Sequence, residues 1–309
     1  MDDCFEGVVR RVYLDPDVSG LTMSSHPALG VMTAEEEDRA NVALNFLNRY
    51  VPMAWNHFLY CRENATPKSV VSRARANRDL VLVLDAALFL EAAADHYTTL
   101  INVFVHGPIP RYALYTVVRG ALEADAWACW LLDTSIDDTE RVGRALTLRA
   151  SNLFEVRRMG LHPVGASAGE HYNRRVKRVM EAGERWHLAA KTHKDGRIAF
   201  VPAPRITALI RSLLPEPSEE NKDLSVGEHT YAALSARAHG TQWALISKAT
   251  PVKHTDDYQT LAYVEVDVLE LIRLLGIAVS LHDEAVKRMT ILSSKPESDW
   301  IARRGPVPW

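Results

Sequence analysis

The chain has 309 residues, of which 47% are hydrophobic and 24% charged, and its formal net charge is −3. This balance is typical of a globular protein with a core of its own, and it excludes the strongly basic total of a dedicated nucleic-acid-binding domain. The three cysteines, Cys4, Cys61 and Cys129, lie far apart, so neither a disulfide framework nor a CxxC metal site is indicated. No apolar run reaches the roughly 20 uninterrupted residues of a membrane span, and the acidic N-terminus does not resemble a signal peptide. We therefore predict a cytoplasmic protein without a membrane partner.

The first third of the sequence predicts an arm followed by helices. Residues 1–32 carry aspartate, proline and glycine at turn positions, so we expect an extended N-terminal arm. The first helix should begin at Thr33, because Thr33-Ala-Glu-Glu36 fits a capping box. Pro52 lies inside the apolar pattern of this helix and should kink it. A second helix should follow Thr66, with a proline at its first helical position.

A short connection in the middle of the chain defines the predicted centre of the fold. Gly107 to Pro110 ends one apolar helix and starts the next, so the two flanking helices should be antiparallel neighbours. This central hairpin pairs about 80–105 with about 110–132. Further helices are predicted at about 139–159, 169–192, 204–214, 226–249 and 257–292.

The last predicted helix is long and carries a continuous apolar stripe from Leu261 to Met289. Such a helix would span on the order of 50 Å, longer than a small domain is wide, and its stripe predicts a homodimer. No alternating pattern able to make a sheet occurs, and residues 293–309 should form an irregular tail. We predict an all-α fold in which residues 33–292 form a single multi-helix bundle.

Two opposite charges stand inside the second helix of the central hairpin. Arg119 and Glu123 are four residues apart in a segment that is otherwise apolar on nearly all sides, so they share a face and can pair. One interpretation is a buried ion pair that fixes the register of neighbouring helices. The other is a polar pocket in the bundle core, where the arginine would bind a carboxylate or phosphate. The sequence leaves both open.

The C-terminal helices add histidines to this question. Ser235 and His239 are four residues apart and share a helix face. They are either satisfied core residues or a functional pair whose imidazole points toward Arg119 and Glu123. His282, next to two acids, is interpreted as part of a solvated helix edge.

Acidic residues on the first helix of the hairpin raise the question of a metal site. Glu91 and Asp95 are four residues apart with His96 beside them. The pattern typical of bundle metal sites is Glu-x-x-His on two helices, and this chain has it once, at Glu184 to His187. We therefore predict no metal ligand, and keep Glu91 and Asp95 as candidates for ligand binding.

Two segments resemble a HEPN-like, all-helical bacterial family of unknown function. VVRGALEADAWACWLLD resembles the Arg-x-x-x-Glu helix of that family, and YAALSARAHGT resembles its Tyr-x-x-Leu-Ser-x-x-x-His segment, so that the similarity covers roughly residues 80–250. The matched positions are Arg119, Glu123, Tyr231, Ser235 and His239. The resemblance implies a helical bundle that often dimerises. Many HEPN domains are metal-independent ribonucleases.

Those ribonucleases use an Arg-x(4–6)-His motif, in which the histidine transfers protons and the arginine stabilises phosphate charge. Here Arg157 and His162 are the one pair with this spacing, and chance alone accounts for one such pair. Arginines on the predicted helices 139–159 and 169–192 would form the phosphate-binding face of a nuclease. The candidates are Arg141, Arg144, Arg157, Arg174, Arg175 and Arg178.

The sequence thus favours a helical HEPN-like protein that binds a ligand or a protein partner around Arg119, Glu123 and His239, without a cofactor and without conventional catalysis. The first alternative is a metal-independent ribonuclease of a defence or toxin system, with RNA as its partner. The second alternative is a metal-binding helical bundle. Whether the protein is an enzyme stays open at this point.

Overall fold

The computed structural model describes residues 33–106, 110, 112–160, 168–214, 226–239, 249–254, 260–264 and 268–308. The predicted arm at 1–32 lies outside these residues, as does the motif residue His162. Within them the prediction of an all-α bundle is confirmed, since helices make up most of the chain. No described helix is long and apolar enough to cross a membrane.

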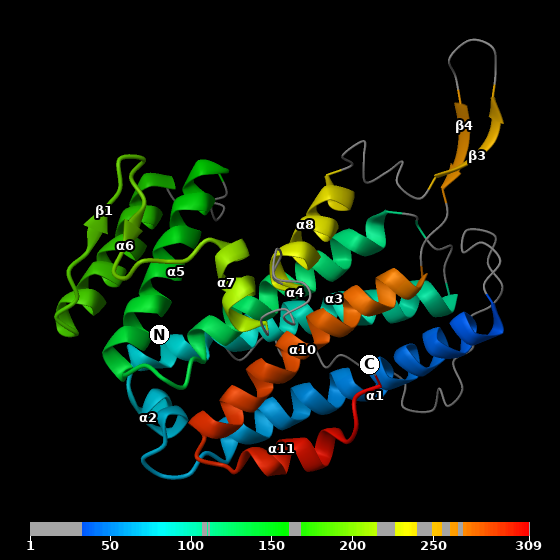
Figure 1. Ribbon diagram of the computed structural model, residues 1–309. Helices are drawn as coiled ribbons and strands as arrows, with labels where there is room; N and C mark the ends of the chain where they lie inside the picture. The colour runs from blue at the N-terminus through cyan, green and yellow to red at the C-terminus, as the bar shows by residue number, and fades with distance from the viewer. Residues whose placement is uncertain are drawn as a thin grey trace.

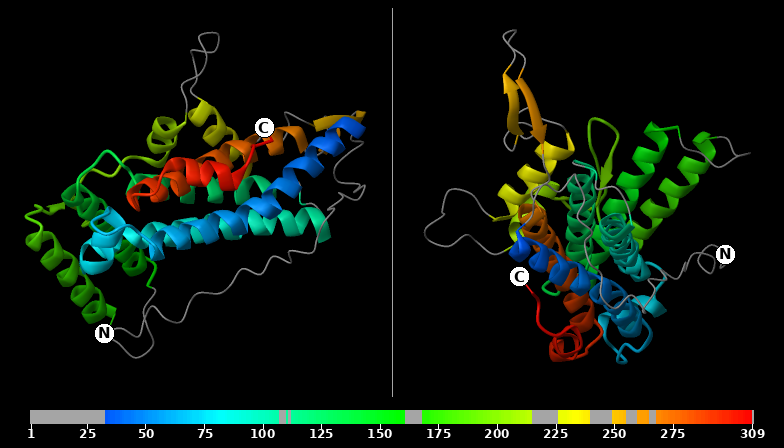
Figure 2. Two further views of the ribbon diagram at one scale, coloured as in Figure 1. Left: turned by 90° about the horizontal axis from the view of Figure 1, so that it is seen from below. Right: turned by 90° about the vertical axis from the view of Figure 1, so that its right-hand side faces the viewer.

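Four long helices form the main bundle (Figure 1). They are α1 (Ala34–Glu63), α3 (Ala86–His106), α4 (Ala113–Leu131) and α10 (Val268–Leu292). The predicted antiparallel hairpin is α3 against α4, and α10 packs on both α4 and α1. Two further views show α1, α3 and α10 running side by side along the length of the bundle (Figure 2). Helix α4 is therefore the central element, as the sequence predicts.

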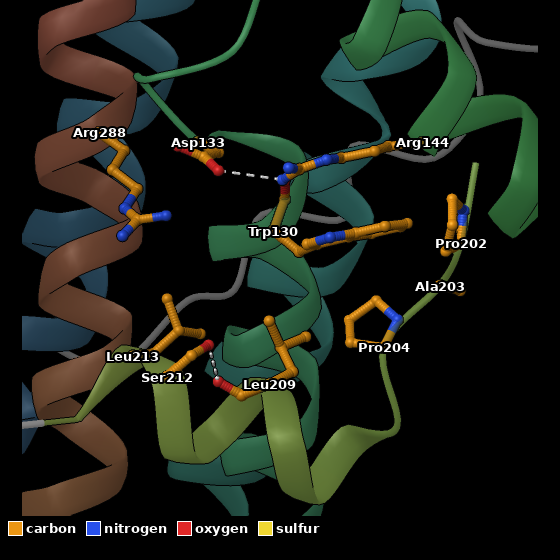
Figure 3. A pocket seen from close by; sticks show the side chains of 10 residues that line it. All are labelled: Trp130, Asp133, Arg144, Pro202, Ala203, Pro204, Leu209, Ser212, Leu213 and Arg288. Atoms are coloured by element: carbon orange, nitrogen blue, oxygen red, sulfur yellow. Dashed lines mark hydrogen bonds and ion pairs between the residues drawn. The ribbon is translucent and has the colours of Figure 1, made fainter.

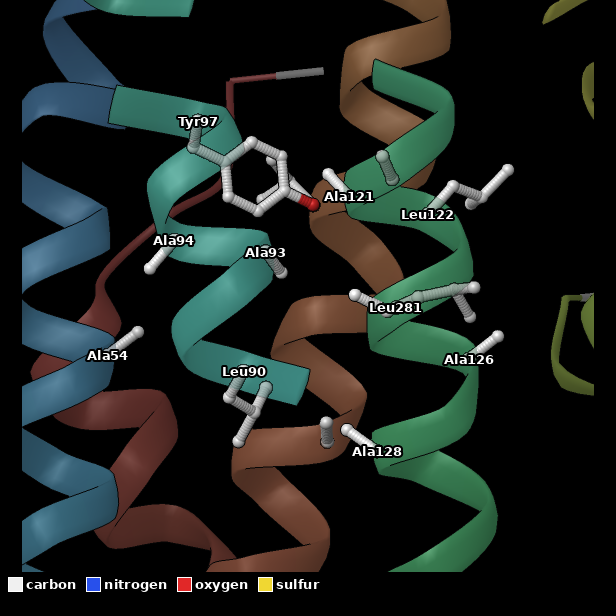
Figure 4. Close-up of a cluster of buried hydrophobic side chains, with 14 of the residues drawn as sticks. Ala54, Leu90, Ala93, Ala94, Tyr97, Ala121, Leu122, Ala126, Ala128 and Leu281 are labelled. Carbon is white, nitrogen blue, oxygen red and sulfur yellow. The ribbon is translucent and has the colours of Figure 1, made fainter. Parts of the chain in front are cut away.

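The core of this bundle combines large apolar side chains with alanines. Leu90 and Tyr97 of α3, Leu122 of α4 and Leu281 of α10 are buried together (Figure 4). Burial of one leucine side chain contributes about 1.5–3 kcal/mol. Alanines let the helix axes approach closely, because interaxial distance depends on the side chains at the contact. These alanines are Ala93, Ala94, Ala121, Ala126 and Ala128.

Helix α1 starts as its sequence predicts. The Thr33 side chain accepts from the Glu36 backbone N–H, and the Glu36 carboxylate accepts from the Thr33 N–H, so the capping box is confirmed. The helix continues through Pro52 to Glu63. The second helix begins later than predicted: α2 (Val70–Ala76) is capped by Ser69, whose hydroxyl accepts from the Ser72 N–H, and not by Thr66.

A second apolar cluster lies beside the bundle, at the left of Figure 1. It is built from η2 (Leu80–Asp85), α5 (Asp138–Arg158), α6 (Ala168–Arg185) and the short hairpin β1 (Lys191–Thr192) with β2 (Ile198–Ala199). Val142 and Leu146 of α5 pack with Val179 of α6 in this cluster. Helix α5, expected to be a further helix of the main bundle, thus packs chiefly on α6 and η2.

Asp79, the residue before η2, links η2 to α6. Both of its carboxylate oxygens accept from the guanidinium of Arg185, the last residue of α6, at 2.7 and 2.8 Å. These hydrogen bonds lower the pKa of Asp79 below its ordinary value. A depressed carboxyl pKa stabilises the fold above the unfolded-state pKa, and this contribution is lost as the pH falls through the folded-state pKa. We therefore expect Asp79→Asn to unfold at a lower urea concentration than wild type at pH 7, with the difference shrinking toward pH 3. Asp95→Asn, at an exposed position of α3, is the control; an equal shift in it would contradict the prediction.

The C-terminal part departs from the predicted helices. The predicted helix 226–249 ends early, since α8 covers Val226–Ala238, and the predicted helix 257–292 starts late, since α10 begins at Val268. Between them β3 (Ala249–His254) pairs antiparallel with β4 (Thr260–Val264). These strands are rich in threonine, valine and tyrosine, which favour extended backbone.

The predicted irregular tail contains a helix, α11 (Glu297–Arg304), that packs on α10 and α1. Its Trp300 is fully buried, which explains why this short segment is ordered into a helix. The apolar stripe of α10 that predicts a homodimer is itself covered within the chain, because Leu271, Leu275 and Met289 are buried in the main core. The homodimer therefore remains a prediction, but the apolar stripe of α10 no longer supports it.

Candidate functional site

Arg119 and Glu123 form an ion pair on α4, with 2.8 Å between Arg119 Nε and Glu123 Oε1. Their side chains are 21% and 33% exposed, so the pair is only partly buried. The expectation that it lies within the bundle core is therefore wrong. Gly120, the next residue, lies against the His96 ring of α3, since a Cβ there would stand 2.5 Å from His96 Nε2. The side chain of Arg119 instead contacts the segment of α8.

Helix α8 completes the site with a tyrosine and with the histidine that follows its last residue. Arg119 Nη2 donates to the Tyr231 hydroxyl at 3.0 Å, and that hydroxyl donates to Glu123 Oε1 at 2.9 Å. Arg119 Nη1 lies 2.9 Å from His239 Nε2. We call Arg119, Glu123, Tyr231 and His239 the Arg119 cluster. The structure thus brings three predicted candidates together, whereas their role in binding stays a prediction.

The protonation states in the Arg119 cluster follow from these contacts. Burial opposes the charge of Arg119, but the hydrogen bonds to Glu123 and Tyr231 outweigh it and raise its pKa. Burial and the hydrogen bond to Glu123 raise the pKa of Tyr231, so its phenol keeps its proton at neutral pH. Since Arg119 can only donate, His239 Nε2 must accept, and the ring proton then sits on Nδ1. That Nδ1 has no partner among the described residues.

A hollow of about 530 Å³ adjoins the Arg119 cluster and opens to solvent between α8 and α7 (Ile206–Leu213). Tyr231 and His239 form part of its wall, and Ser235 stands one helical turn before His239, as predicted from the spacing. Thr207 of α7 lies on the other side. Glu228 at one end of the hollow pairs with Arg211 at 3.2 Å. The hollow therefore offers hydroxyl and imidazole donors beside the arginine.

Glu91 and Asp95 are not part of this site. Glu91 is half-buried and Asp95 exposed on α3, and no hydrogen bond joins either of them to the Arg119 cluster. In the part of the chain that the structure describes, no three histidine, cysteine, aspartate or glutamate side chains lie close enough together to hold a metal ion. This finding gives the metal-binding alternative no support.

Two of the arginines proposed to bind nucleic acid lie in the first turns of α5 and are engaged within the protein. Arg141 is 1% exposed and donates to the Ile136 carbonyl at 2.8 Å, and burial lowers its pKa. The side chain of Arg144 is 13% exposed and pairs with both Asp133 and Glu140. The prediction for Arg141 is wrong, because this side chain is buried against the body of the protein. Arg144 is only partly buried, and its role in binding stays a prediction.

The other four candidate arginines lie on the outer surface of α5 and α6. Arg157 is exposed, and its guanidinium carbon lies 4.8 Å from the centre of the Tyr172 ring. Arg174, Arg175 and Arg178 are exposed on α6. Among the described residues no ion pair engages these three, whereas the neighbouring Lys177 stands 3.9 Å from a glutamate. They form a basic surface remote in sequence from the Arg119 cluster.

The sequence analysis missed a buried polar group in the same helix as Arg119. Asp125 is fully buried, accepts from the Tyr97 hydroxyl at 2.8 Å and lies 2.7 Å from His282 Nδ1. The interpretation of His282 as a solvated residue is wrong, since it is 2% exposed. Burial raises the pKa of Asp125, although His282 and Tyr97 act against this. The signal was available, because an acid in a helix apolar on nearly all sides must find a partner.

Comparison with known proteins adds no assignment: no family model, curated protein or solved structure matches the chain. The HEPN-like resemblance therefore stays a prediction.

Proposed function

We propose that the protein binds a small ligand, or an acidic group of a protein partner, in the hollow beside the Arg119 cluster. The observation that carries this proposal is the convergence of Arg119, Glu123, Tyr231 and His239, from two helices far apart in sequence, at the edge of an open hollow. These are four of the five positions on which the HEPN-like resemblance rests, and the fifth, Ser235, lines the same hollow.

The energetics favour a binding role over a purely structural one. Arg119 and Glu123 are partly exposed, so solvent screens their ion pair, and its contribution to stability is closer to the roughly 0–1 kcal/mol of a surface pair than to that of a buried one. A hydrogen-bonded set of four polar side chains is therefore an inefficient way to hold α8 on α4. As a binding site it is well organised, since Glu123 and Tyr231 fix the guanidinium before a ligand arrives.

The donors around the hollow indicate a ligand with an anionic oxygen group. Of the side chains that line the hollow, His239 Nδ1–H and the Ser235 hydroxyl can donate. Arg119 does not line the hollow itself, but it contacts the lining residues Tyr231 and His239 and uses three of its five N–H groups within the cluster. Hydrogen bonds to a carboxylate or phosphate are stronger than those between neutral groups. The rest of the lining is formed by Ala232, Ala236, Thr207 and Glu228, whose carboxylate pairs with Arg211.

Thermal unfolding in the presence of inorganic phosphate and of uridine monophosphate tests this proposal. We expect these probes to raise the melting temperature of the wild type and of His229→Ala, an exposed histidine on the same helix, but not that of His239→Ala. Arg119→Ala should lose the response as well. If Arg119→Ala and Glu123→Ala lose most of their stability and neither probe protects the wild type, the cluster is structural and the proposal fails.

A second candidate function is metal-independent cleavage of RNA at the same cluster. The contact of an arginine with a histidine, next to a carboxylate and a phenol, supports it, because these groups can move protons and stabilise phosphate charge. The expected result is cleavage of single-stranded RNA in the presence of EDTA, lost in His239→Ala and retained in His229→Ala. Equal cleavage by His239→Ala would assign the activity elsewhere or to a contaminant.

The exposed arginines of α6 extend this second candidate. If they hold the RNA backbone, replacing Arg174, Arg175 and Arg178 by glutamine should weaken RNA binding and reduce its salt dependence. The predicted cytoplasmic location and homodimer belong to the proposal as well; a monomeric mass in light scattering would contradict the dimer.

A further inference from the structure

A second pocket, of about 520 Å³, lies away from the Arg119 cluster, where the main bundle meets α5 and α7 (Figure 3). Arg288 of α10 reaches toward it from one side, and Arg144 of α5 lies across the ring of Trp130. The segment Pro202 to Pro204 borders another side, and α7 closes the remaining wall with Leu209 and Leu213. None of these residues lines the hollow beside the Arg119 cluster.

Both arginines are fixed by contacts that leave part of each guanidinium unused. Arg288 donates from Nε to Glu284 and from Nη1 to the Cys129 carbonyl, both at 2.8 Å. Its side chain is 19% exposed. Its Nη2 has no hydrogen-bond partner within the described ranges. A partly buried guanidinium with unused N–H groups binds an anion more strongly than a fully exposed one, because solvent screens it less.

Arg144 repeats this arrangement on the other side. It donates from Nε to Glu140 at 3.0 Å and from Nη1 to the Trp130 carbonyl at 2.8 Å and to Asp133 at 3.1 Å. Its guanidinium carbon lies 5.1 Å from the centre of the Trp130 ring, which holds the side chain flat against the indole. Here too, Nη2 has no partner among the residues that the structure describes.

The acids near the pocket do not remove its capacity to bind an anion. Asp133 accepts from the Ser135 backbone N–H and hydroxyl and from Arg144, and these bonds lower its pKa in spite of burial. Glu284 is occupied by Arg288 and by Lys287 at 3.1 Å. Both carboxylates thus serve to hold cations in place, while the groups that face the pocket without a partner are N–H donors.

We propose that this pocket binds an organic oxyanion: its carboxylate, phosphate or sulfonate group at the free N–H groups of Arg288 and Arg144, and its flat or apolar body against Trp130, Leu209 and Leu213. Pro202 and Pro204 restrict the backbone on either side of Ala203, so this border of the pocket loses little conformational entropy when a ligand binds. The site stands independently of the hollow beside His239.

The fluorescence of 8-anilinonaphthalene-1-sulfonate tests the proposal, because this probe combines a sulfonate with an aromatic body. We expect saturable binding to the wild type and binding about tenfold weaker to Arg288→Gln, the size of effect given by loss of a charged hydrogen bond. Ser212→Asp, which places a negative charge at an exposed position of the pocket wall, should weaken binding as well. The uncharged analogue N-phenyl-1-naphthylamine should bind all three proteins within about twofold of one another.

Two controls separate the pocket from general effects. Arg149→Gln removes an arginine of α5 that pairs with Asp85 outside the pocket, and His239→Ala alters the other site; both should keep the wild-type affinity for the sulfonate. The proposal is overturned if the wild type shows no saturable binding, or if Arg288→Gln and Ser212→Asp both retain it. An equal loss in Arg149→Gln would also overturn it. If phosphate no longer raises the melting temperature of His239→Ala while sulfonate binding is unchanged, the two sites are independent of each other.

Discussion

Replacing Asp125 by alanine is expected to lower the free energy of unfolding by about 2–6 kcal/mol, because it leaves two buried polar groups without a partner at about 1–3 kcal/mol each. Asp125 is fully buried between Tyr97 and His282. Alanine would leave the Tyr97 hydroxyl and His282 Nδ1 without their partner in the core. The rings of Tyr97 and Tyr50 also pack in edge geometry with that of His282.

Urea unfolding followed by circular dichroism measures this effect. Asp125→Asn should cost less than Asp125→Ala, because an amide can still accept from Tyr97 and can donate to a neutral His282. Asp95→Ala, at an exposed position of the neighbouring α3, should change stability by no more than roughly 0.5 kcal/mol. If Asp125→Ala were as stable as Asp95→Ala, the buried hydrogen bonds described above would be wrong.

Trp300→Ala is expected to cost a similar amount, about 3–5 kcal/mol, because it removes a large and fully buried side chain. The indole holds α11 on the bundle: its ring centre lies 5.0 Å from that of His57, and Nε1 donates to Asp283 at 2.8 Å. Without it, α11 should detach from α1 and α10. Burial of Asp283, which raises its carboxyl pKa, would then be relieved.

The neighbouring Ile301, 47% exposed, provides the matched control, and Ile301→Ala should lower the melting temperature only slightly. Trp300→Phe should recover part of the loss, since it restores the ring and not the donor. Limited proteolysis would locate the change, with early cleavage near α11 in Trp300→Ala alone. Cleavage at the same rate as in the wild type would mean that α11 does not depend on its tryptophan.

Much of the fold could be predicted because local signals determine it. The capping box at Thr33 and the short Gly107–Pro110 connection act over a few residues, and they give the start of α1 and the pairing of α3 with α4. The strands β3 and β4 pair with each other over a short connection. They were not predicted, because Leu261 and Val264 of β4 also fit the helical spacing of the apolar residues in α10, and this spacing could not indicate where the helix begins.

The site was predictable to the same extent. Spacing alone places Arg119 beside Glu123 on one helix face, and the structure has them paired. Spacing does not indicate which element covers that face. The sequence therefore could not show that the pair is partly exposed and is contacted by α8. For the same reason the sequence could not show that Arg141 is buried and Arg144 partly buried. Helical spacing does not indicate which side of a basic helix faces the rest of the protein.

The way in which α8 is attached to the bundle determines how easily the hollow opens. The buried apolar side chains of α8 are small apart from Leu234 and Tyr231. Polar contacts hold the helix as well, through Tyr231 in the Arg119 cluster and through Arg237, which donates to Glu270 at 2.6 Å over the ring of Tyr115. A helix with so few large buried side chains can open at a smaller free-energy cost than the bundle beneath it. The hollow therefore exists only while α8 is docked. A ligand that contacts both α7 and α8 would stabilise the docked position of α8. By the same linkage, any change that keeps α8 docked would raise the affinity for that ligand.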